Sequence, residues 1–222
     1  MTRHERFWDR IAARYAARPV RDPAAYERTL ARAAAHLSSD ATVVEFGCGT
    51  GTTALRLAPA VARLDATDFS SAMVAIAREK AEAAGAVTVA VFRADLFDPE
   101  AVTGPYDTAL AFNFLQLTPD LPAALDAISR RLKPGGLFIS KTVCLGEKGW
   151  RAARLLVGVL KAARIAPPLQ FHSIAGLDAA IAAAGFEIIE RGVFPERPPA
   201  RFLVARKAGG LRETSRALPP SP

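Results

Sequence analysis

The chain has 222 residues, a formal net charge of +7 and a hydrophobic content of 50%. This length and apolar content suffice for one domain with a large core. The two cysteines lie far apart and outside any zinc-binding spacing, so we expect free thiols, a reducing compartment and no metal. No apolar run reaches membrane-span length, and the charged N-terminus is unlike a signal peptide. The basic charge fits nucleic acid, anionic lipid or an acidic substrate, and a general enrichment in alanine and arginine also explains it.

Residues 1–40 are predicted to be helical. An apolar stripe at helical spacing is formed by Phe7, Trp8, Ile11 and Tyr15. Pro19 interrupts this stripe, and Asp22 followed by Pro23 is typical of a second helix with an aspartate cap and a proline in its first turn.

The most informative stretch is 43–52, VVEFGCGTGT. It predicts a buried strand, a glycine turn and the start of a helix over 53–60. Glycines at 47, 49 and 51 allow positive φ and close approach of a ligand to the backbone. The pattern departs from the dinucleotide fingerprint, because Thr52 stands where the third glycine would be. Glu45 would repel a pyrophosphate and suits a positively charged ligand, although a glycine turn without any ligand is the alternative.

The alternation of strands and helices continues along the chain. A second strand ends at Asp68, 17 residues after Gly51, and Ser70 caps the following helix. Further strands are predicted at 87–94, 106–113 and 136–140, and two at 185–194 and 201–207 should pair antiparallel. We therefore predict an α/β fold: a Rossmann-like, seven-stranded, mostly parallel sheet with helices on both faces and an antiparallel last strand.

Five segments together resemble one family. They are VVEFGCGTGTTALRLA, LDATDFSSAMVAIAREKA, FRADLFD, YDTALAFNFLQLTPD and ISRRLKPGGLFIS. In this order, residues 8–207 resemble class I S-adenosylmethionine-dependent methyltransferases. The resemblance implies that S-adenosylmethionine is the cofactor and that residues 1–40 form a helical lid on a methyltransferase domain at 41–207. Residues 208–222 are predicted to be a disordered tail.

The resemblance also implies roles for individual residues. The cofactor-binding set is Tyr15, Glu45, Gly47, Gly49, Gly51, Asp68, Phe69, Met73, Asp95, Leu96 and Asn113. Glu45 and the glycines would surround the methionine part, Asp68 would bind the ribose, and Asn113 would lie near the sulfonium. The adenine would meet Phe69, Met73, Asp95 and the Leu96 backbone, and Tyr15 would cover the cofactor. Alternatives remain: Asp68 and Asp95 as plain caps, and Met73 as core packing.

Residues 148–166 distinguish this chain. From 148 to 165 there are five basic residues and no acidic residue. On a helix, the basic side chains fall within an arc of roughly 140°, opposite an aliphatic arc. Such a pattern is typical of a helix in a membrane interface, and an ordinary lid helix over the site is the alternative. The candidate membrane or substrate residues are Lys141, Trp150, Arg151, Arg154, Lys161 and Arg164.

Methyl transfer from a sulfonium mainly requires a positioned, desolvated nucleophile. Tyr15, Tyr26 and His172 are the candidate catalytic residues, although a lone histidine is more often structural. Lys141 lies at a strand end, where parallel sheets bind ligands, and a solvated surface lysine is its alternative. Small-molecule relatives often carry His-His where this chain has Gln116-Leu117, which weakens the case for phenol methylation.

We therefore expect a cytoplasmic methyltransferase, with peripheral attachment to an anionic membrane as a further expectation. The acceptor favoured by the basic segment is an amphipathic lipid, with N-methylation of phosphatidylethanolamine towards phosphatidylcholine as the specific reaction. The first alternative is a quinone precursor or other soluble small molecule. A non-catalytic, basic nucleic-acid-binding protein on the same fold is the alternative from another class; nucleic acid is disfavoured, because no RNA-binding module accompanies the acidic site residues. The oligomeric state is left open.

Overall fold

The computed structural model describes residues 3–150 and 169–209. They contain a seven-stranded sheet of order β3-β2-β1-β4-β5-β7-β6. The strands are β1 (Thr42–Phe46), β2 (Arg63–Asp68), β3 (Val89–Arg93), β4 (Tyr106–Phe112), β5 (Leu132–Val143), β6 (Phe186–Glu196) and β7 (Pro199–Lys207). The first five pair in parallel, and β7 is antiparallel to both β5 and β6. The predicted fold is therefore confirmed.

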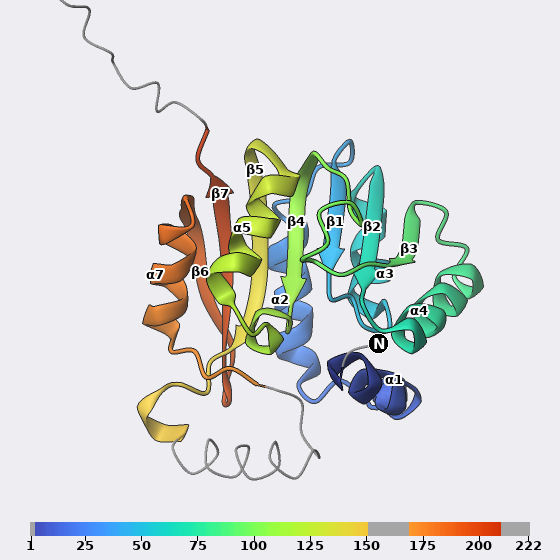
Figure 1. The fold of residues 1–222 in the computed structure, drawn as a ribbon, viewed down its shortest axis with the longest axis horizontal. Coiled ribbons are helices and arrows are strands. Elements are labelled where there is room, and N and C mark those ends of the chain that lie inside the picture. Colours follow the sequence, from blue (N-terminus) through green and yellow to red (C-terminus); the bar gives the residue numbers. More distant parts are fainter. Residues whose placement is uncertain (1–2, 151–168, 210–222) are drawn as a thin grey trace, which may run out of the picture.

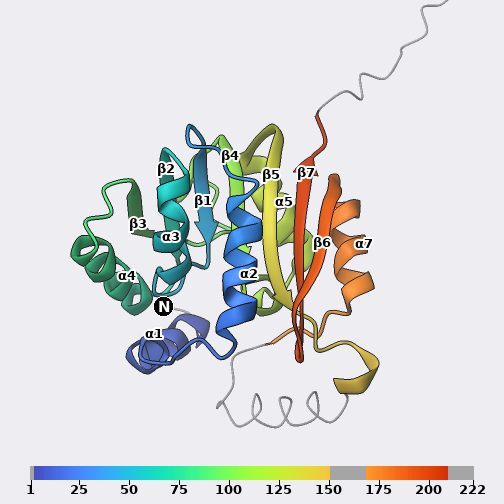
Figure 2. The same cartoon turned by 180° about the vertical axis from the view of Figure 1, so that it is seen from behind.

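Helices cover both faces of the sheet. They are α1 (Arg3–Ala16), α2 (Pro23–Ala34), α3 (Thr52–Leu57), α4 (Ser71–Ala83), α5 (Leu121–Arg131) and α7 (Ile174–Ala183), with short 3-10 turns η1 (Ala58–Ala60), η2 (Leu115–Leu117) and η3 (Lys148–Trp150). Helix α5 covers one face, and α2 and α3 cover the other (Figures 1 and 2). Helix α1 lies beyond the ends to which β1, β2 and β4 point (Figure 1).

Two apolar clusters fill the space between the sheet and these helices. One joins α5 and α7 to the sheet and includes Phe138, Ile128 and Leu177. The other joins α2 and α3 to the opposite face and includes Leu30 and Leu110. Because the central strands are buried on both faces, their sequences are nearly continuous apolar runs.

Local signals for helix starts are confirmed. Asp22 caps α2 by accepting a 2.9 Å hydrogen bond from the Ala25 N–H, and Ser70 accepts one of 3.2 Å from the Met73 N–H at the start of α4. The helix expected over 53–60 is shorter, because α3 passes into η1 where Pro59 lies. The third strand begins at Val89 rather than 87, since Val87 is 96% exposed.

Two predicted features lie outside the described residues: Arg151, Arg154, Lys161 and Arg164 of the basic segment, and the tail beyond 209. Trp150 ends η3 and is partly buried. Among the described residues, no helix is long and apolar enough to cross a bilayer.

Candidate cofactor and acceptor site

The loop between β1 and α3 depends on its three glycines. Gly47, Gly49 and Gly51 have φ values of +67°, +55° and +74°. A Cβ on Gly47 would lie 2.2 Å from the Phe114 ring, and one on Gly51 would lie 2.9 Å from the Ala77 Cβ. The loop therefore packs closely on two sides. A Cβ on Gly49 would be in ordinary van der Waals contact with the Tyr15 ring at 3.9 Å, so Tyr15 lies over this part of the loop.

Glu45 ends in a buried and only partly satisfied carboxylate. Its Oε2 has no hydrogen-bond partner in the described part of the chain. Burial raises the pKa of Glu45 to about 8, the nearby Asp68 carboxylate adds to the effect, and a backbone hydrogen bond from Ala54 opposes it. An unpartnered buried carboxylate fits a ligand that brings a positive charge or a hydrogen-bond donor.

Asp68 lies where the sequence predicts, at the end of β2. Its two oxygens each accept a 2.9 Å hydrogen bond, one from the Gly49 N–H and one from the Ser70 N–H. Burial raises the pKa of Asp68, and these two hydrogen bonds oppose the shift. The carboxylate thus fixes the glycine loop relative to α4. Because an ionised carboxylate has about four acceptor positions, Asp68 can also accept hydroxyl donors from a ligand.

The predicted adenine residues, which we call the rim, follow the ends of β2 and β3, two strands that pair with each other. Met73 and Leu96 are buried, and Phe69 is partly buried. Asp95 is exposed and accepts a 3.0 Å hydrogen bond from the Phe97 N–H, which is the turn-capping geometry. Contact of these four residues with a ligand stays a prediction.

Helix α1 is attached beside this rim. The Asp9 carboxylate accepts hydrogen bonds from the Ser70 hydroxyl at 2.6 Å and the Ala72 N–H at 3.1 Å. Glu5, which is buried, pairs with Arg93 at 2.7 Å. Sequence reasoning identified the apolar stripe of α1 and missed these polar contacts, because no local pattern links residues this far apart.

Two tyrosines border the acidic pair. Tyr15 is 43% exposed, packs edge-on against Trp8, and has a raised pKa because of burial and of Asp68 and Glu45. The Tyr26 hydroxyl lies 3.3 Å from the Thr53 hydroxyl. Burial raises the pKa of Tyr26, the Glu45 charge adds to this effect, and the hydrogen bond with Thr53 opposes it. Both phenols are therefore neutral near pH 7 and can donate hydrogen bonds.

Lys141 is not the solvated surface lysine of the alternative interpretation, because it is 8% exposed. Burial lowers its pKa, and the Asp22 charge opposes the shift. The Lys141 carbonyl accepts a 2.7 Å hydrogen bond from the Asn113 N–H. Asn113 is exposed and has a φ of +54°, a left-handed conformation that asparagine tolerates.

His172 lies beside the cluster under α5 and α7, which includes Leu115. It forms a hydrogen bond with the Leu115 backbone, burial lowers its pKa, and its Nε2 is buried without a partner. The side-chain oxygen of Gln116, next to Leu115, is also buried and unpartnered. His172 is therefore a neutral imidazole with a free nitrogen. Within the described ranges, no hydrogen bond or ring contact joins it to Tyr15 or Tyr26.

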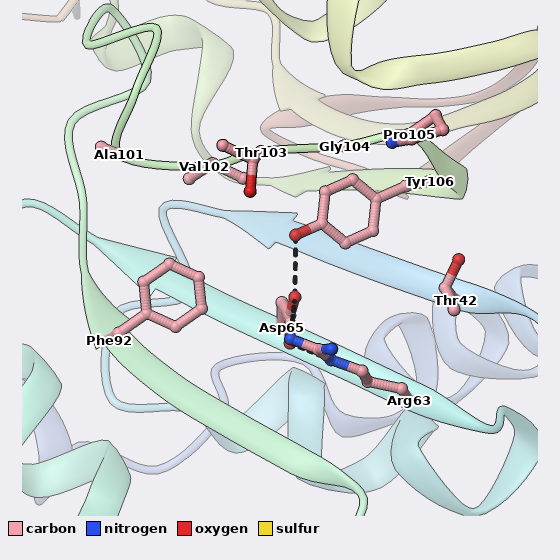
Figure 3. A pocket seen from close by; sticks show the side chains of 10 residues that line it. All are labelled: Thr42, Arg63, Asp65, Phe92, Ala101, Val102, Thr103, Gly104, Pro105 and Tyr106. Carbon is pink, nitrogen blue, oxygen red and sulfur yellow. Dashed lines mark hydrogen bonds and ion pairs between the residues drawn. The ribbon is translucent and has the colours of Figure 1, made fainter.

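A separate pocket of about 420 Å³ lies at the opposite, amino-terminal edge of the sheet. In Figure 3 the Tyr106 hydroxyl points to Asp65, to which it donates a 2.7 Å hydrogen bond. Arg63 pairs with the same buried carboxylate at 2.8 Å. These groups satisfy one another, so we ascribe to them a structural role. The candidate site is at the carboxyl edge, where open α/β sheets bind ligands.

Comparisons with known proteins agree with this geometry. A family model described as a methyltransferase domain matches residues 14–191, and the chain belongs to that family. The ubiquinone biosynthesis O-methyltransferase of Sodalis glossinidius is 29% identical over 125 residues, 56% of this chain and 49% of the relative. That of Paramagnetospirillum magneticum is 33% identical over 116 residues, 50% of this chain and 44% of the relative. The matches thus span about half the length of these curated relatives.

The fold has solved counterparts. The magnesium protoporphyrin IX methyltransferase of Synechocystis PCC 6803, solved with S-adenosylhomocysteine, superposes with a TM-score of 0.69 at 21% identity, covering 91% of this chain and 94% of that one. This likeness shows the fold. The chain thus carries a methyltransferase domain, and its Rossmann-like fold is that of class I S-adenosylmethionine-dependent methyltransferases.

The residues present suit that cofactor. The free Glu45 oxygen can accept from an ammonium, and Asp68 retains acceptor positions for ribose hydroxyls. The structure brings Tyr15, Glu45 and Asp68 together, because both carboxylates raise the pKa of Tyr15. Contact of this set with the cofactor stays a prediction.

Proposed function

We propose that this protein methylates a hydroxyl group on a small aromatic acceptor, such as a quinone precursor, using S-adenosylmethionine. The observation that carries the cofactor part is the free Glu45 carboxylate beside the glycine loop and Asp68. The acceptor part is supported by the two curated relatives, each a ubiquinone biosynthesis O-methyltransferase. The absence of the His-His pair, replaced by Gln116-Leu117, means that another group must handle the acceptor proton.

When bound, the cofactor supplies a methyl group that passes from sulfur to the acceptor oxygen, while the electron pair of the broken C–S bond remains on sulfur. The chain's own residues orient and desolvate the reactants. We assign Glu45 to the cofactor ammonium, Asp68 to the ribose hydroxyls and Tyr15 to the cover. Tyr26, as a neutral phenol, donates to the acceptor oxygen rather than removing its proton.

The acceptor hydroxyl must lose its proton as the new C–O bond forms. Among the candidate catalytic residues, His172 alone combines a neutral ring with an unpartnered nitrogen. We propose that it accepts this proton, directly or through one water molecule. The matched test is His172→Gln, which should lower kcat at neutral pH more than it changes cofactor affinity.

The decisive experiment follows transfer of a labelled methyl group to catechol and, separately, to total membrane lipid. We expect label on catechol, and strong loss of activity in Asp68→Ala, whose cofactor affinity should fall by about 10- to 100-fold. Asp126→Ala is the matched control, because Asp126 is an exposed aspartate paired with Arg130 on α5. Label confined to lipid would overturn the aromatic acceptor, and tight cofactor binding by Asp68→Ala would overturn its ribose assignment.

A lipid acceptor is the second candidate, favoured by the basic amphipathic sequence at 148–165. In this second candidate, phosphatidylethanolamine is the substrate and the protein is attached peripherally to the cytoplasmic face of the membrane. Each basic residue near an anionic surface contributes about 1 kcal/mol. Sedimentation with phosphatidylglycerol-containing vesicles tests it: binding should fall as salt rises and when Arg151, Arg154, Lys161 and Arg164 are replaced by glutamine. Failure to bind anionic vesicles at low salt would rule out this candidate.

A further inference from the structure

We infer that Lys141 selects the acceptor by binding an anionic group on it, a carboxylate, beside the reacting hydroxyl. The inference rests on the proposed function, because it assumes that the carboxyl edge of the sheet receives the acceptor. It adds a specificity-determining residue and narrows the substrate class to aromatic acids.

The strand register places Lys141 on the same side of the sheet as Glu45. Glu45 pairs with Leu110, Leu110 pairs with Ile139, and Lys141 lies two residues beyond Ile139. Because side chains alternate between faces, Lys141 shares the face of Glu45 and lies one repeat nearer the carboxyl edge. Two strand spacings, roughly 10 Å in all, separate them laterally. Phe112 of β4 pairs with Lys141 and lies between the two positions on the same face, so an acceptor ring that reaches the lysine would pack against Phe112.

The Lys141 ammonium lacks a bonded partner in the described ranges, in contrast to the other lysines there whose side chains are described. Lys80 donates to the Thr50 and Thr52 hydroxyls, Lys133 pairs with Asp107, and Lys207 donates to the Ser129 and Leu132 carbonyls. Lys141 is more deeply buried than Lys133, which has a side-chain exposure of 44%. Lys141 is 8% exposed as a residue, and its ammonium has no hydrogen-bonded acceptor among the described residues, so it can bind an anionic ligand.

Among the described residues, the surroundings of Lys141 supply one carboxylate, which is not hydrogen-bonded to the lysine. The Asp22 carboxylate is the charge that acts on Lys141, and it already accepts the Ala25 N–H as the cap of α2. Phe112 and Phe202, the strand partners of Lys141, are buried apolar residues that limit access of water. The Asp22 charge opposes the lowering of the Lys141 pKa by burial, and a ligand carboxylate would give the ammonium a charge-assisted hydrogen bond.

The test uses two catechols that differ in one group: 3,4-dihydroxybenzoate and its neutral amide, 3,4-dihydroxybenzamide. Wild-type protein saturated with S-adenosylhomocysteine should bind the carboxylate about 10- to 100-fold more tightly in calorimetric titration. With S-adenosylmethionine, the same preference should appear in kcat/KM, mainly through KM. Lys141→Gln should abolish the preference, and Lys141→Arg should retain part of it, because arginine keeps the charge but cannot act as a base.

Lys133→Gln is the matched control, since it removes a lysine charge at the opposite edge of the sheet and should leave the preference unchanged. Unaltered affinity for S-adenosylhomocysteine shows that each variant is folded. Equal binding of acid and amide by the wild type, or a preference that survives Lys141→Gln, overturns the inference even if catechols are methylated. Selective binding of the acid without turnover would support the role of Lys141 and overturn the proposed methylation. If neither compound binds or reacts, both the role of Lys141 and the proposed methylation are overturned.

Discussion

The Asp9 carboxylate of α1 accepts a 2.6 Å hydrogen bond from the hydroxyl of Ser70, the residue that caps α4. Ser70 also donates its backbone N–H to Asp68. These hydrogen bonds therefore connect the N-terminal helix to Asp68, the residue assigned to the ribose. A movement of α1 should change the position of Ser70 and, through it, of Asp68.

Asp9→Ala should loosen the predicted lid. The variant loses the acceptor for the Ser70 hydroxyl and the Ala72 N–H, at a cost of about 1–2 kcal/mol. We expect S-adenosylmethionine to dissociate several-fold faster, which stopped-flow displacement can measure. Asp126→Ala should leave the rate unchanged. Equal dissociation rates in Asp9→Ala and wild type would mean that α1 does not cover the cofactor.

Glu45 should make the cofactor-free protein less stable as pH rises. Its pKa is raised from 4.5 to about 8, so the folded state holds a proton that the unfolded state has released over this range. Stability due to this group is therefore present below about pH 4.5 and lost progressively up to about pH 8.

Glu45→Gln removes that titration. Relative to wild type, the variant should gain stability between pH 5 and pH 9, on the order of a few kcal/mol. Urea unfolding at a series of pH values without cofactor provides the comparison. If the stability difference between the two proteins does not change with pH, Glu45 titrates normally.

Gly47→Ala should destabilise the protein more than Gly85→Ala does. Both glycines have positive φ, so each substitution costs about 1–2 kcal/mol of backbone strain. The Cβ at position 47 would also meet the Phe114 ring at 2.2 Å, whereas position 85 has open space. The extra cost should be on the order of 1–3 kcal/mol. Thermal unfolding measures it, and Phe114→Leu should relieve part of it in a double-mutant cycle.

Tyr106→Phe should lower stability without affecting the cofactor. The buried Asp65 carboxylate would lose its 2.7 Å hydrogen bond and retain only the partly exposed Arg63, at a cost of about 1–3 kcal/mol. Affinity for S-adenosylmethionine should stay within about twofold, because the pair lies at the opposite edge of the sheet. Thr103→Val, in the same pocket, is the control for a lost hydroxyl. A large fall in affinity would show that the two edges are coupled.

Structural features that are determined by a short stretch of sequence could be predicted. Contacts between residues that are far apart in the sequence could not. The glycine loop, Asp68 and the caps at Asp22 and Ser70 each follow from local pattern. The contact between Asp9 and Ser70 joins residues 61 positions apart, and no periodicity records it. One feature of the sequence indicated that Lys141 would be buried. Lys141 occupies the same face as Ile139 within a strand that is buried on both sides. A lysine at a strand end is usually exposed, so this signal was weak on its own.

The ion pair between Arg32 in α2 and Glu190 in β6 has an N–O distance of 2.6 Å and joins residues 158 positions apart. His36 contacts the second oxygen of the same carboxylate at 2.6 Å. During synthesis, α2 leaves the ribosome long before Glu190 exists, so its packing must wait for nearly the whole chain. Closing a loop of this length is slow compared with forming local helices. Helix α2 should therefore reach its final position only after the C-terminal strands have formed, although it is among the first parts of the chain to be synthesised.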